Sequence, residues 1–336
     1  MNITRSALAF VFACILSENR VPLFGMRLGV LLTLAQPAVA FELAFPAACT
    51  LGETCYIQQY PDHDPGPGAR DFTCGPLSYD GHDGTDIALL NRAEMAQGIA
   101  VLAAAAGTVI GLRDGVQDFV PFTQGQECGN GVVLDNGDGW QTQYCHMRQG
   151  SVAVTKGQHV DTGTPLGMVG QSGMADFPHV HLTVRHNGAK VDPFEPDAAA
   201  CNVVQGPGLW SQPIAYQPGG LTIAGFSDAI PQFDAIKSGL VTPTLPATAP
   251  GLVLWVEGFG IRAGDTLGFS ITGPQGEVLT NSATMPAPKA LMFYATGKKL
   301  TSTAWLTGSY QGQVTLTRDG KIISHASTMV EIRVRQ

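Results

Sequence analysis

The sequence predicts an all-β protein of two domains: an antiparallel β-sheet domain and, after it, a small β-sandwich. Its 336 residues are enough for two domains that each bury a hydrophobic core. Its 41 glycines and 22 prolines follow no repeat and separate short apolar runs, which is typical of many strands joined by tight turns. Apolar residues make up 44% of the chain and charged residues 14%, a balance that suits a folded, soluble protein.

Residues 1–40 are predicted to be a leader. Met26 and Arg27 begin a short basic stretch, an apolar run follows, and Ala38-Val39-Ala40 forms a small-x-small cleavage site. We expect cleavage after Ala40 and translation from Met26; the alternative is one unusually long leader. No apolar run reaches the roughly 18 residues of a membrane span. The mature chain is therefore expected to be periplasmic or secreted, without a transmembrane segment.

Six cysteines follow the leader: Cys49, Cys55, Cys74, Cys128, Cys145 and Cys201. An even number in an exported chain predicts disulfide bonds, although spacing alone does not choose among the pairings. One pair can be argued, because the runs on either side of Gly137-Asp138-Gly139 should form a hairpin that places Cys128 and Cys145 at adjacent strand ends. A cysteine-rich metal site is the weaker interpretation, since no C-x-x-C spacing occurs.

The formal net charge is −8, of which residues 1–40 carry +2, so the rest of the chain carries about −10. This acidic balance disfavours nucleic acid as a partner, because nucleic-acid binding is driven by a basic surface. It equally provides no electrostatic attraction to an anionic cell-wall polymer.

Short β runs separated by glycine turns fill residues 76–200, after a Cys-containing segment over residues 41–75. The runs read TDIALL, IAVLAAAAGTVIGL, NGVVLDN, WQTQYCH, PLGMVG and HVHLTVRH. The alanines of the second run leave a helix open as an alternative, but the alternation around residues 107–110 favours a strand. Residues 76–200 are therefore expected to form the sheet domain.

The second half of the chain changes in composition. Residues 201–250 are rich in Pro, Gly, Thr and Ala and are expected to be a linker. New β runs over residues 251–336 predict an accessory β-sandwich of the immunoglobulin-like kind. Within it, Asp319-Gly320 between two apolar runs is a strong signal for a two-residue hairpin turn. No cluster of titratable residues occurs there, so we expect no chemistry of this domain.

The chemical signal lies in polar residues of three separate motifs: His82, Asp86, His146, His179 and His181. His179 and His181 are two apart in a strand and share one face, which suits a metal ligand next to a proton-transfer group. Gly81 and Gly84 disfavour a helix around His82. A tight loop is therefore expected to bring His82 and Asp86 together as nitrogen and oxygen ligands. Taken singly, each motif is more often structural than functional.

Together, these motifs resemble the lysostaphin/LytM-type zinc metallopeptidases. H-x-G-x-D at residues 82–86 precedes Y-x-H at residues 144–146 and H-x-H at residues 179–181. The stretch VTKGQHVDTGTPLGMVGQSGMADFPHVHLTVR and the following VDPFEP are similar to segments of the family, so the resemblance covers roughly residues 76–197. Met147 in place of the usual leucine, and Cys145 inside the second motif, are mild departures. The resemblance implies the family's antiparallel β-sheet metallopeptidase fold.

Carried over residue by residue, the resemblance implies that His82, Asp86 and His181 ligate one zinc ion. Three protein ligands leave one position for water, which zinc makes nucleophilic near neutral pH. No H-E-x-x-H glutamate is present, so His146 and His179 are expected to share proton transfer and oxyanion stabilisation. Tyr144, expected on the same strand face as His146, is either a further donor or simply packed. The remaining histidines are expected at the surface: His63, His159, His186 and His325.

The function that the resemblance implies is that of an exported zinc metalloendopeptidase that cleaves peptide bonds in bacterial peptidoglycan cross-links or stems. Two alternatives stay open: a secreted protease of the same family acting on glycine-rich proteins, and a non-catalytic envelope scaffold or activator. The segment over residues 41–75 is a candidate inhibitory lid, and the accessory domain a candidate for binding an envelope partner.

Overall fold

The computed structural model describes residues 40–197, 201 and 208–334. The predicted leader, with its start at Met26, lies outside the described residues except for Ala40 at its end. Within the described part of the chain, no helix is both long enough and apolar enough to cross a bilayer.

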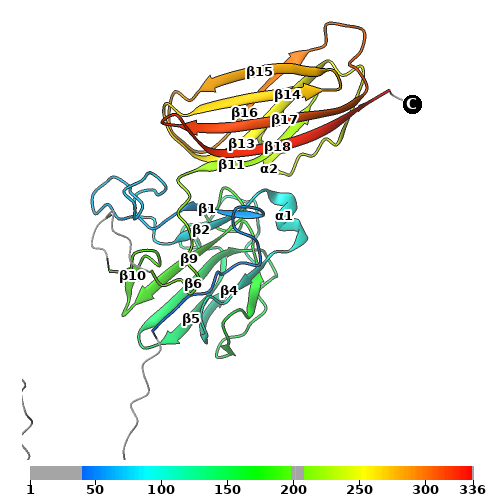
Figure 1. Cartoon of the computed structure of the whole chain (residues 1–336). Helices are drawn as coiled ribbons and strands as arrows, with labels where there is room; N and C mark the ends of the chain where they lie inside the picture. Colours follow the sequence, from blue (N-terminus) through cyan, green and yellow to red (C-terminus); the bar gives the residue numbers. More distant parts are fainter. Residues whose placement is uncertain (1–39, 198–200, 202–207, 335–336) are drawn as a thin grey trace, which may run out of the picture. The chain divides into compact units, whose positions relative to one another are not determined.

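An eight-stranded sheet dominates the first part of the fold (Figure 1). Its strand order is β1-β2-β9-β6-β5-β4-β7, with β10 paired to β9, and every pairing is antiparallel. The strands are β1 (Cys55–Gln59), β2 (Thr85–Leu89), β4 (Gly107–Arg113), β5 (Asn130–Gly137), β6 (Trp140–Met147), β7 (His159–Val160), β9 (His179–His186) and β10 (Ala189–Val191). A separate pair is formed by β3 (Ala100–Leu102) and β8 (Pro165–Met168). Because β1 pairs with β2, this part of segment 41–75 belongs to the sheet.

The strand predicted around residues 107–110 is confirmed, whereas the four alanines over residues 103–106 lie in neither a helix nor a strand. The preceding helix α1 (Arg92–Gln97) is capped by the Asn91 side chain at its start and ends at Gly98, whose φ of +88° closes it. Strands β3 and β4 follow. The hairpin across residues 137–139 is also confirmed, since it joins β5 to β6.

All six cysteines after the leader form disulfides: Cys49–Cys55, Cys74–Cys201 and Cys128–Cys145. The predicted Cys128–Cys145 pair is confirmed, and the alternative of a cysteine metal site is wrong.

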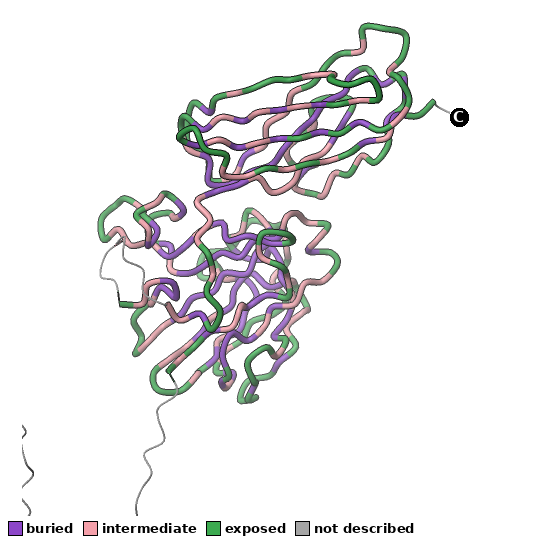
Figure 2. The backbone as a smooth tube through the Cα atoms, viewed as in Figure 1, coloured by how far each residue is buried: buried purple, intermediate pink, exposed green. Residues whose placement is uncertain are grey.

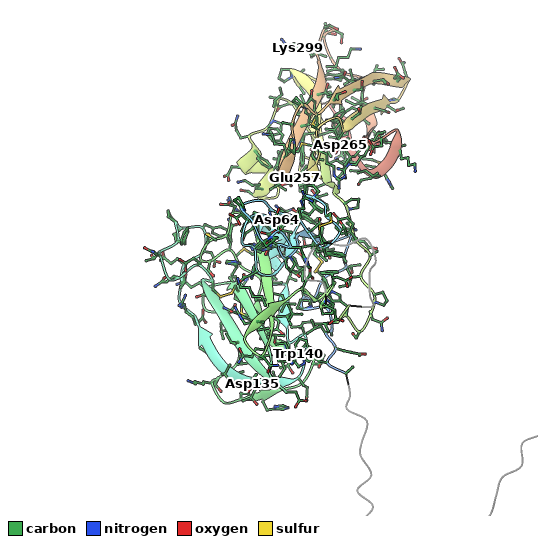
Figure 3. The ribbon with its side chains drawn as sticks, turned by 90° about the vertical axis from the view of Figure 1, so that its left-hand side faces the viewer. Asp64, Asp135, Trp140, Glu257, Asp265 and Lys299 are labelled. Carbon is green, nitrogen blue, oxygen red and sulfur yellow. A yellow bond between two sulfur atoms is a disulfide. The ribbon has the colours of Figure 1, made fainter. Side chains whose placement is uncertain are left out.

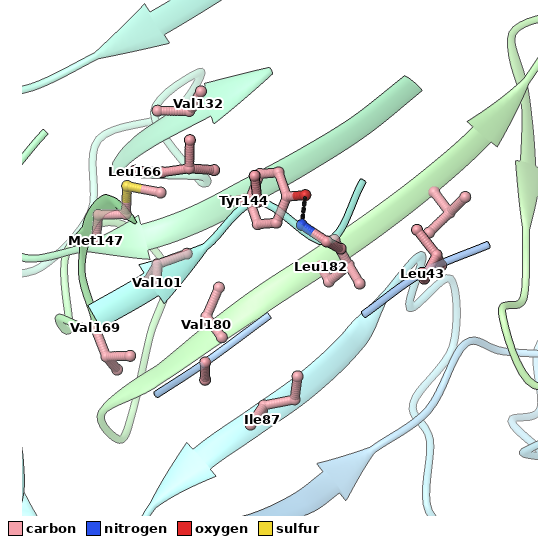
Figure 4. Close-up of a cluster of buried hydrophobic side chains, with 14 of the residues drawn as sticks. Leu43, Ile87, Val101, Val132, Tyr144, Met147, Leu166, Val169, Val180 and Leu182 are labelled. Carbon is pink, nitrogen blue, oxygen red and sulfur yellow. Dashed lines mark hydrogen bonds between the residues drawn. The ribbon is translucent and has the colours of Figure 1, made fainter. Parts of the chain in front are cut away.

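The core of this first part lies under one face of the sheet (Figure 2). Strand alternation sends Val180, Leu182 and Val184 of β9 into it, each no more than 1% exposed. Figure 4 shows how residues from β2, β5, β6 and β9 meet there, with Tyr144 accepting a hydrogen bond from the Ala104 amide. The apolar face of β9 thus fixes the side to which its histidines point.

The later part of the chain forms two further sheets (Figure 1). One has the order β11-β13-β16, and the other has the order β12-β18-β17-β14-β15. The strands are β11 (Gly220–Ser227), β12 (Thr244–Pro246), β13 (Gly251–Ile261), β14 (Thr266–Gly273), β15 (Gly276–Thr284), β16 (Lys289–Lys299), β17 (Gly308–Arg318) and β18 (Lys321–Arg333), with one short helix α2 (Phe233–Lys237).

Both sheets contribute to one hydrophobic core, which includes Leu254 of β13 and Phe269 of β14. The immunoglobulin-like kind of this sandwich stays a prediction. The turn at Asp319-Gly320 is confirmed as a hairpin, with Arg318 opposite Lys321 and both turn residues at positive φ. Strands β11 and β12 fall within residues 201–250, so part of the range expected to be a linker is strand.

Candidate metal and catalytic site

The H-x-G-x-D motif forms a tight loop that runs into β2. His82 is 3% exposed, and its Nδ1 donates a hydrogen bond of 2.8 Å to the Tyr60 carbonyl. This bond leaves the lone pair on Nε2. Gly84 lies where the loop passes the His181 ring: a Cβ there would be 2.5 Å from His181 Nε2 and 2.6 Å from the Leu182 carbonyl. Only glycine lets the loop approach so closely.

The sheet register brings the other two predicted ligands to the same point. Asp86 of β2 lies directly opposite His181 of β9, and residues opposite each other in an antiparallel pair project to the same face. His181 Nδ1 is 2.8 Å from Asp86 Oδ1, His82 Nε2 is 3.2 Å from that oxygen, and the two ring nitrogens are 3.2 Å apart. Thus all three sequence-predicted ligand residues converge, each buried.

This donor set fits a zinc ion. Ligands about 2.0–2.2 Å from a tetrahedral zinc are roughly 3.4 Å from one another, close to the observed separations. Burial alone would raise the pKa of Asp86, but the neighbouring His82 and His179 hold it well below its usual range. An ionised carboxylate and two imidazole nitrogens crowded at one point favour a cation between them. The residues present therefore match the chemistry of zinc.

Asp83 also contacts the candidate site, although the sequence did not single it out. Its Oδ1 is 3.2 Å from His181 Nε2, and its Oδ2 is 3.0 Å from Lys190 Nζ. The hydrogen bond to His181 lowers the pKa of Asp83 most, and the hydrogen bond to Lys190 lowers it further. Thr183 Oγ1 lies 3.1 Å from the same His181 nitrogen. Since these groups occupy Nε2, they orient His181 with Nδ1 toward the other ligands. The sequence signal was the acidic residue itself, because Asp83 stands at the first variable position of the H-x-G-x-D motif.

A β-bulge at the end of β6 places His146. The pairing with β5 shifts between Tyr144 and Met147, and His146 has a φ of +62°. The bulge turns two consecutive residues, Cys145 and His146, to the groove side, where both contribute to the wall. Tyr144 instead is fully buried in the core. The expectation that Tyr144 and His146 share a strand face is therefore wrong, because a regular period of two does not hold at the bulge.

His146 and His179 lie side by side next to the three converging residues, with ring centroids 4.5 Å apart. His146 Nδ1 donates to the Ser172 carbonyl at 2.8 Å, and His179 Nδ1 donates to the Phe177 carbonyl at 2.9 Å. Burial lowers the pKa of both imidazoles. Both are therefore neutral near pH 7 and present an unprotonated Nε2, as proton acceptors require.

The remaining histidines divide into two groups. His159 and His325 are exposed, as expected. His63 is not, because only 7% of its side chain is exposed and its Nε2 lies 2.7 Å from Asp192 Oδ2. His186 is half-buried and stacks on Trp140, which is labelled in Figure 3. Neither of these two joins the site.

The site opens into a groove of about 620 Å³. Its walls include Asp83, Asp86 and the three histidines of β6 and β9, with Gln58 and Gln59 from β1 and Tyr79 from the loop before β2. A groove of this size, open to solvent and lined by backbone-anchored imidazoles, suits an extended peptide next to a metal centre.

Comparison with known proteins supports this interpretation. The model of peptidase family M23 matches residues 80–193. Peptidoglycan DD-endopeptidase ShyA of Vibrio cholerae is 31% identical over 111 residues, which is 33% of this chain and 22% of that protein. Cell division protein DipM of Caulobacter vibrioides is 32% identical over 100 residues, covering 30% of this chain and 15% of that protein. The chain thus spans less than a quarter of either relative.

Among solved structures, the catalytic domain of the prophage-encoded M23 protein EnpA from Enterococcus faecalis is 26% identical. That match covers 45% of this chain and 95% of the EnpA domain, with a TM-score of 0.30.

Proposed function

We propose that the chain is a zinc metalloendopeptidase that hydrolyses peptide bonds in peptidoglycan cross-links or stems. The match of residues 80–193 to the model of peptidase family M23 supports this proposal. The observation that carries the proposal is the convergence of His82, Asp86 and His181, whose ligand atoms all lie within 4.8 Å of one another. The name of the Vibrio cholerae relative, a peptidoglycan DD-endopeptidase, supports the choice of substrate.

The metal site is assigned to His82 Nε2, Asp86 Oδ1 and His181 Nδ1. Zinc bound by such a set supplies a Lewis acid and lowers the pKa of water toward about 7. The chain's own contribution is orientation. The Tyr60 carbonyl holds the His82 ring, Asp83 and Thr183 hold the His181 ring, and strand pairing holds Asp86. None of these groups has to reorganise during the reaction.

His146 and His179 are assigned the proton transfers. In its neutral form each ring has its proton on Nδ1, bound to a carbonyl, so Nε2 accepts the proton of the attacking water. The imidazolium formed then donates that proton to the leaving amine or a hydrogen bond to the developing oxyanion. His179 Nε2 is 3.6 Å from Asp86 Oδ1, and this carboxylate stabilises the protonated form of His179.

Digestion of purified peptidoglycan tests the proposal. Mass spectrometry of the fragments should show peptide-bond cleavage by the zinc-loaded protein and none after chelation. His181→Ala should abolish both stoichiometric zinc and activity, whereas His146→Ala and His179→Ala should keep zinc and lose activity. Lys156→Gln, at an exposed turn, is the matched control. If the wild-type protein holds no stoichiometric zinc and the activity of His181→Ala is unchanged, the proposal that the chain is a zinc metalloendopeptidase is wrong.

The same digestion separates the alternatives. A glycine-rich protein incubated in parallel would be the better substrate if the chain were a secreted protease of that specificity. Zinc binding without cleavage of either substrate would support a non-catalytic scaffold. The intact donor set and both histidines favour the enzyme over the scaffold.

Export to the periplasm or the medium is part of the proposal. Three disulfides support it, because disulfides persist in oxidising compartments. Mass spectrometry of the N-terminus of the protein isolated from cells tests the predicted cleavage after Ala40.

A further inference from the structure

One strand face carries the metal site and then continues along the groove. On β9, the alternate residues His179, His181, Thr183 and Arg185 all contribute to the groove wall. With a rise of about 3.3 Å per residue, the Cα atom of Arg185 lies roughly 13 Å from that of His181. Arg185 is half-buried, and it is the single Lys or Arg side chain among the described residues of this groove wall.

The surroundings of Arg185 provide no counter-charge. Its cross-strand neighbours are Gln141 of β6 and Lys190 of β10, and neither carries a carboxylate. Lys190 binds Asp83, so this nearby acid is already engaged by a cation and by His181. Across the described chain, no ion pair joins Arg185 to another residue.

Such an arrangement favours the binding of an anion. Two cations directly opposite each other on neighbouring strands repel, and the acid that balances Lys190 does not balance Arg185. A guanidinium forms two parallel hydrogen bonds to a carboxylate, which makes it the preferred partner for that group. Apart from Asp83 and Asp86, the acids of the groove are Glu127, just before β5, and Asp176, just before β9. Because β5 starts beside the end of β6, and β6 ends beside the first half of β9, both acids belong to the opposite end of the β9 face from Arg185.

We propose that Arg185 binds a free carboxylate of the substrate peptide and thereby selects acidic peptides over uncharged, glycine-rich ones. This inference rests on the proposed function and names the substrate class of the same groove. An extended peptide spans about 3.3–3.6 Å per residue, so the carboxylate belongs to a residue about two to four positions from the scissile bond.

A pair of synthetic cross-linked peptides that differ only in one group tests the inference: a free carboxylate in one and a carboxamide in the other. The zinc-loaded wild type should cleave the carboxylate form with a kcat/KM about 10- to 100-fold higher. Arg185→Gln should lose this preference, because its kcat/KM should fall on the carboxylate form far more than on the carboxamide form, and Arg185→Lys should keep part of it. Arg70→Gln, an exposed arginine outside the groove wall, should keep all of it.

Two results would overturn the inference: a preference that persists in Arg185→Gln, or an equal loss on both peptides, as a merely structural residue would give. Binding provides a readout that does not depend on cleavage. Calorimetry on zinc-loaded His179→Ala should show tighter binding of the carboxylate peptide, and the added Arg185→Gln change should abolish the difference. If the wild type binds the peptides with this difference but cleaves neither them nor peptidoglycan, the proposed function fails while the role of Arg185 stands.

Discussion

His181 makes contacts through both ring nitrogens. Nδ1 faces His82 and Asp86, whereas Nε2 lies within 3.2 Å of Asp83 and Thr183. A carboxylate behind a ligating imidazole fixes its tautomer and increases its basicity. The geometry at this residue therefore extends the candidate metal centre beyond its three candidate ligands.

Asp83→Asn is expected to weaken zinc binding by about 10- to 100-fold, because the amide removes the charge that supports His181 as a ligand. Competition with a chromophoric chelator at neutral pH measures the affinity directly. Asp80→Asn, an exposed acid in the same loop, should bind zinc as the wild type does. Equal affinities of the two variants would mean that Asp83 does not support the ligand.

The convergence of His82, Asp86 and His181, with His146 and His179 beside them, was predictable because three spaced motifs occur in the order that resembles the lysostaphin/LytM-type family. Asp83 was not, since its role follows from its distance to a ring 98 residues away. Tyr144 was assigned to the wrong face because nothing in WQTQYCH marks the left-handed φ of His146. The alternation of side chains between the two faces of a strand places His179 and His181 correctly, because the strand is regular there. It does not place His146, because a bulge interrupts the alternation.

At the scale of elements, the bulged end of β6 depends on a covalent link. The Cys128–Cys145 disulfide joins the residue before His146 to the start of β5, and the His146 amide donates to the Cys128 carbonyl at 2.8 Å. A residue other than glycine at positive φ is held there by its surroundings, at a cost of about 1–3 kcal/mol.

Replacing Cys128 and Cys145 together by serine is therefore expected to reduce kcat by about tenfold or more at a temperature well below unfolding, with zinc content unchanged. Stability should fall by about 3 kcal/mol. Removing Cys49–Cys55 in the same way should lower stability by about 2 kcal/mol and leave kcat as it was. Retention of full activity by the Cys128/Cys145 variant would show that backbone pairing alone positions His146.

Strand β13 is buried at every position, and it includes one carboxylate, Glu257 (Figure 3). Burial raises the pKa of Glu257 from 4.5 to about 7, with Lys237 opposing the shift, and Oε2 has no hydrogen-bond partner within the described residues. The folded state thus holds more protons than the unfolded state between these pH values. The free energy of unfolding should then decrease as pH rises through this window, by about 3 kcal/mol in all.

Glu257→Gln should remove this penalty. Thermal unfolding should show the variant more stable than the wild type at pH 8 and nearly equal to it at pH 4.5. Glu277→Gln, exposed on β15, controls for the change of net charge. If the difference in stability between Glu257→Gln and the wild type does not depend on pH, then Glu257 ionises in the folded protein without lowering its free energy of unfolding.

Most strands of both parts were predictable from short apolar runs between glycines, and the hairpins at residues 137–139 and 319–320 from turn chemistry. Strands β11 and β12 were missed because they lie in a Pro- and Gly-rich range, where composition favours a linker. Their pairing with β13 and β18 depends on long-range contacts, which local patterns do not contain.

At the scale of the whole molecule, the described chain contains two main hydrophobic cores, one under the eight-stranded sheet and one between the two later sheets. All three zinc-ligand candidates lie in the part of the chain that forms the eight-stranded sheet and the first core. A ligand that binds only the folded form stabilises the part that holds it, by about 2.7 kcal/mol at 100 times its dissociation constant. Zinc stabilises the second core as well only if the two cores unfold together as one unit.

Calorimetric unfolding is therefore expected to show two transitions, of which zinc raises one by about 5–10 °C and leaves the other in place. Chelation should return the shifted midpoint to that of the metal-free protein, and His181→Ala should show two transitions that zinc does not move. A single transition that shifts as a whole would mean that both cores unfold together. Identical shifts in the wild type and His181→Ala would place zinc elsewhere than between His82, Asp86 and His181.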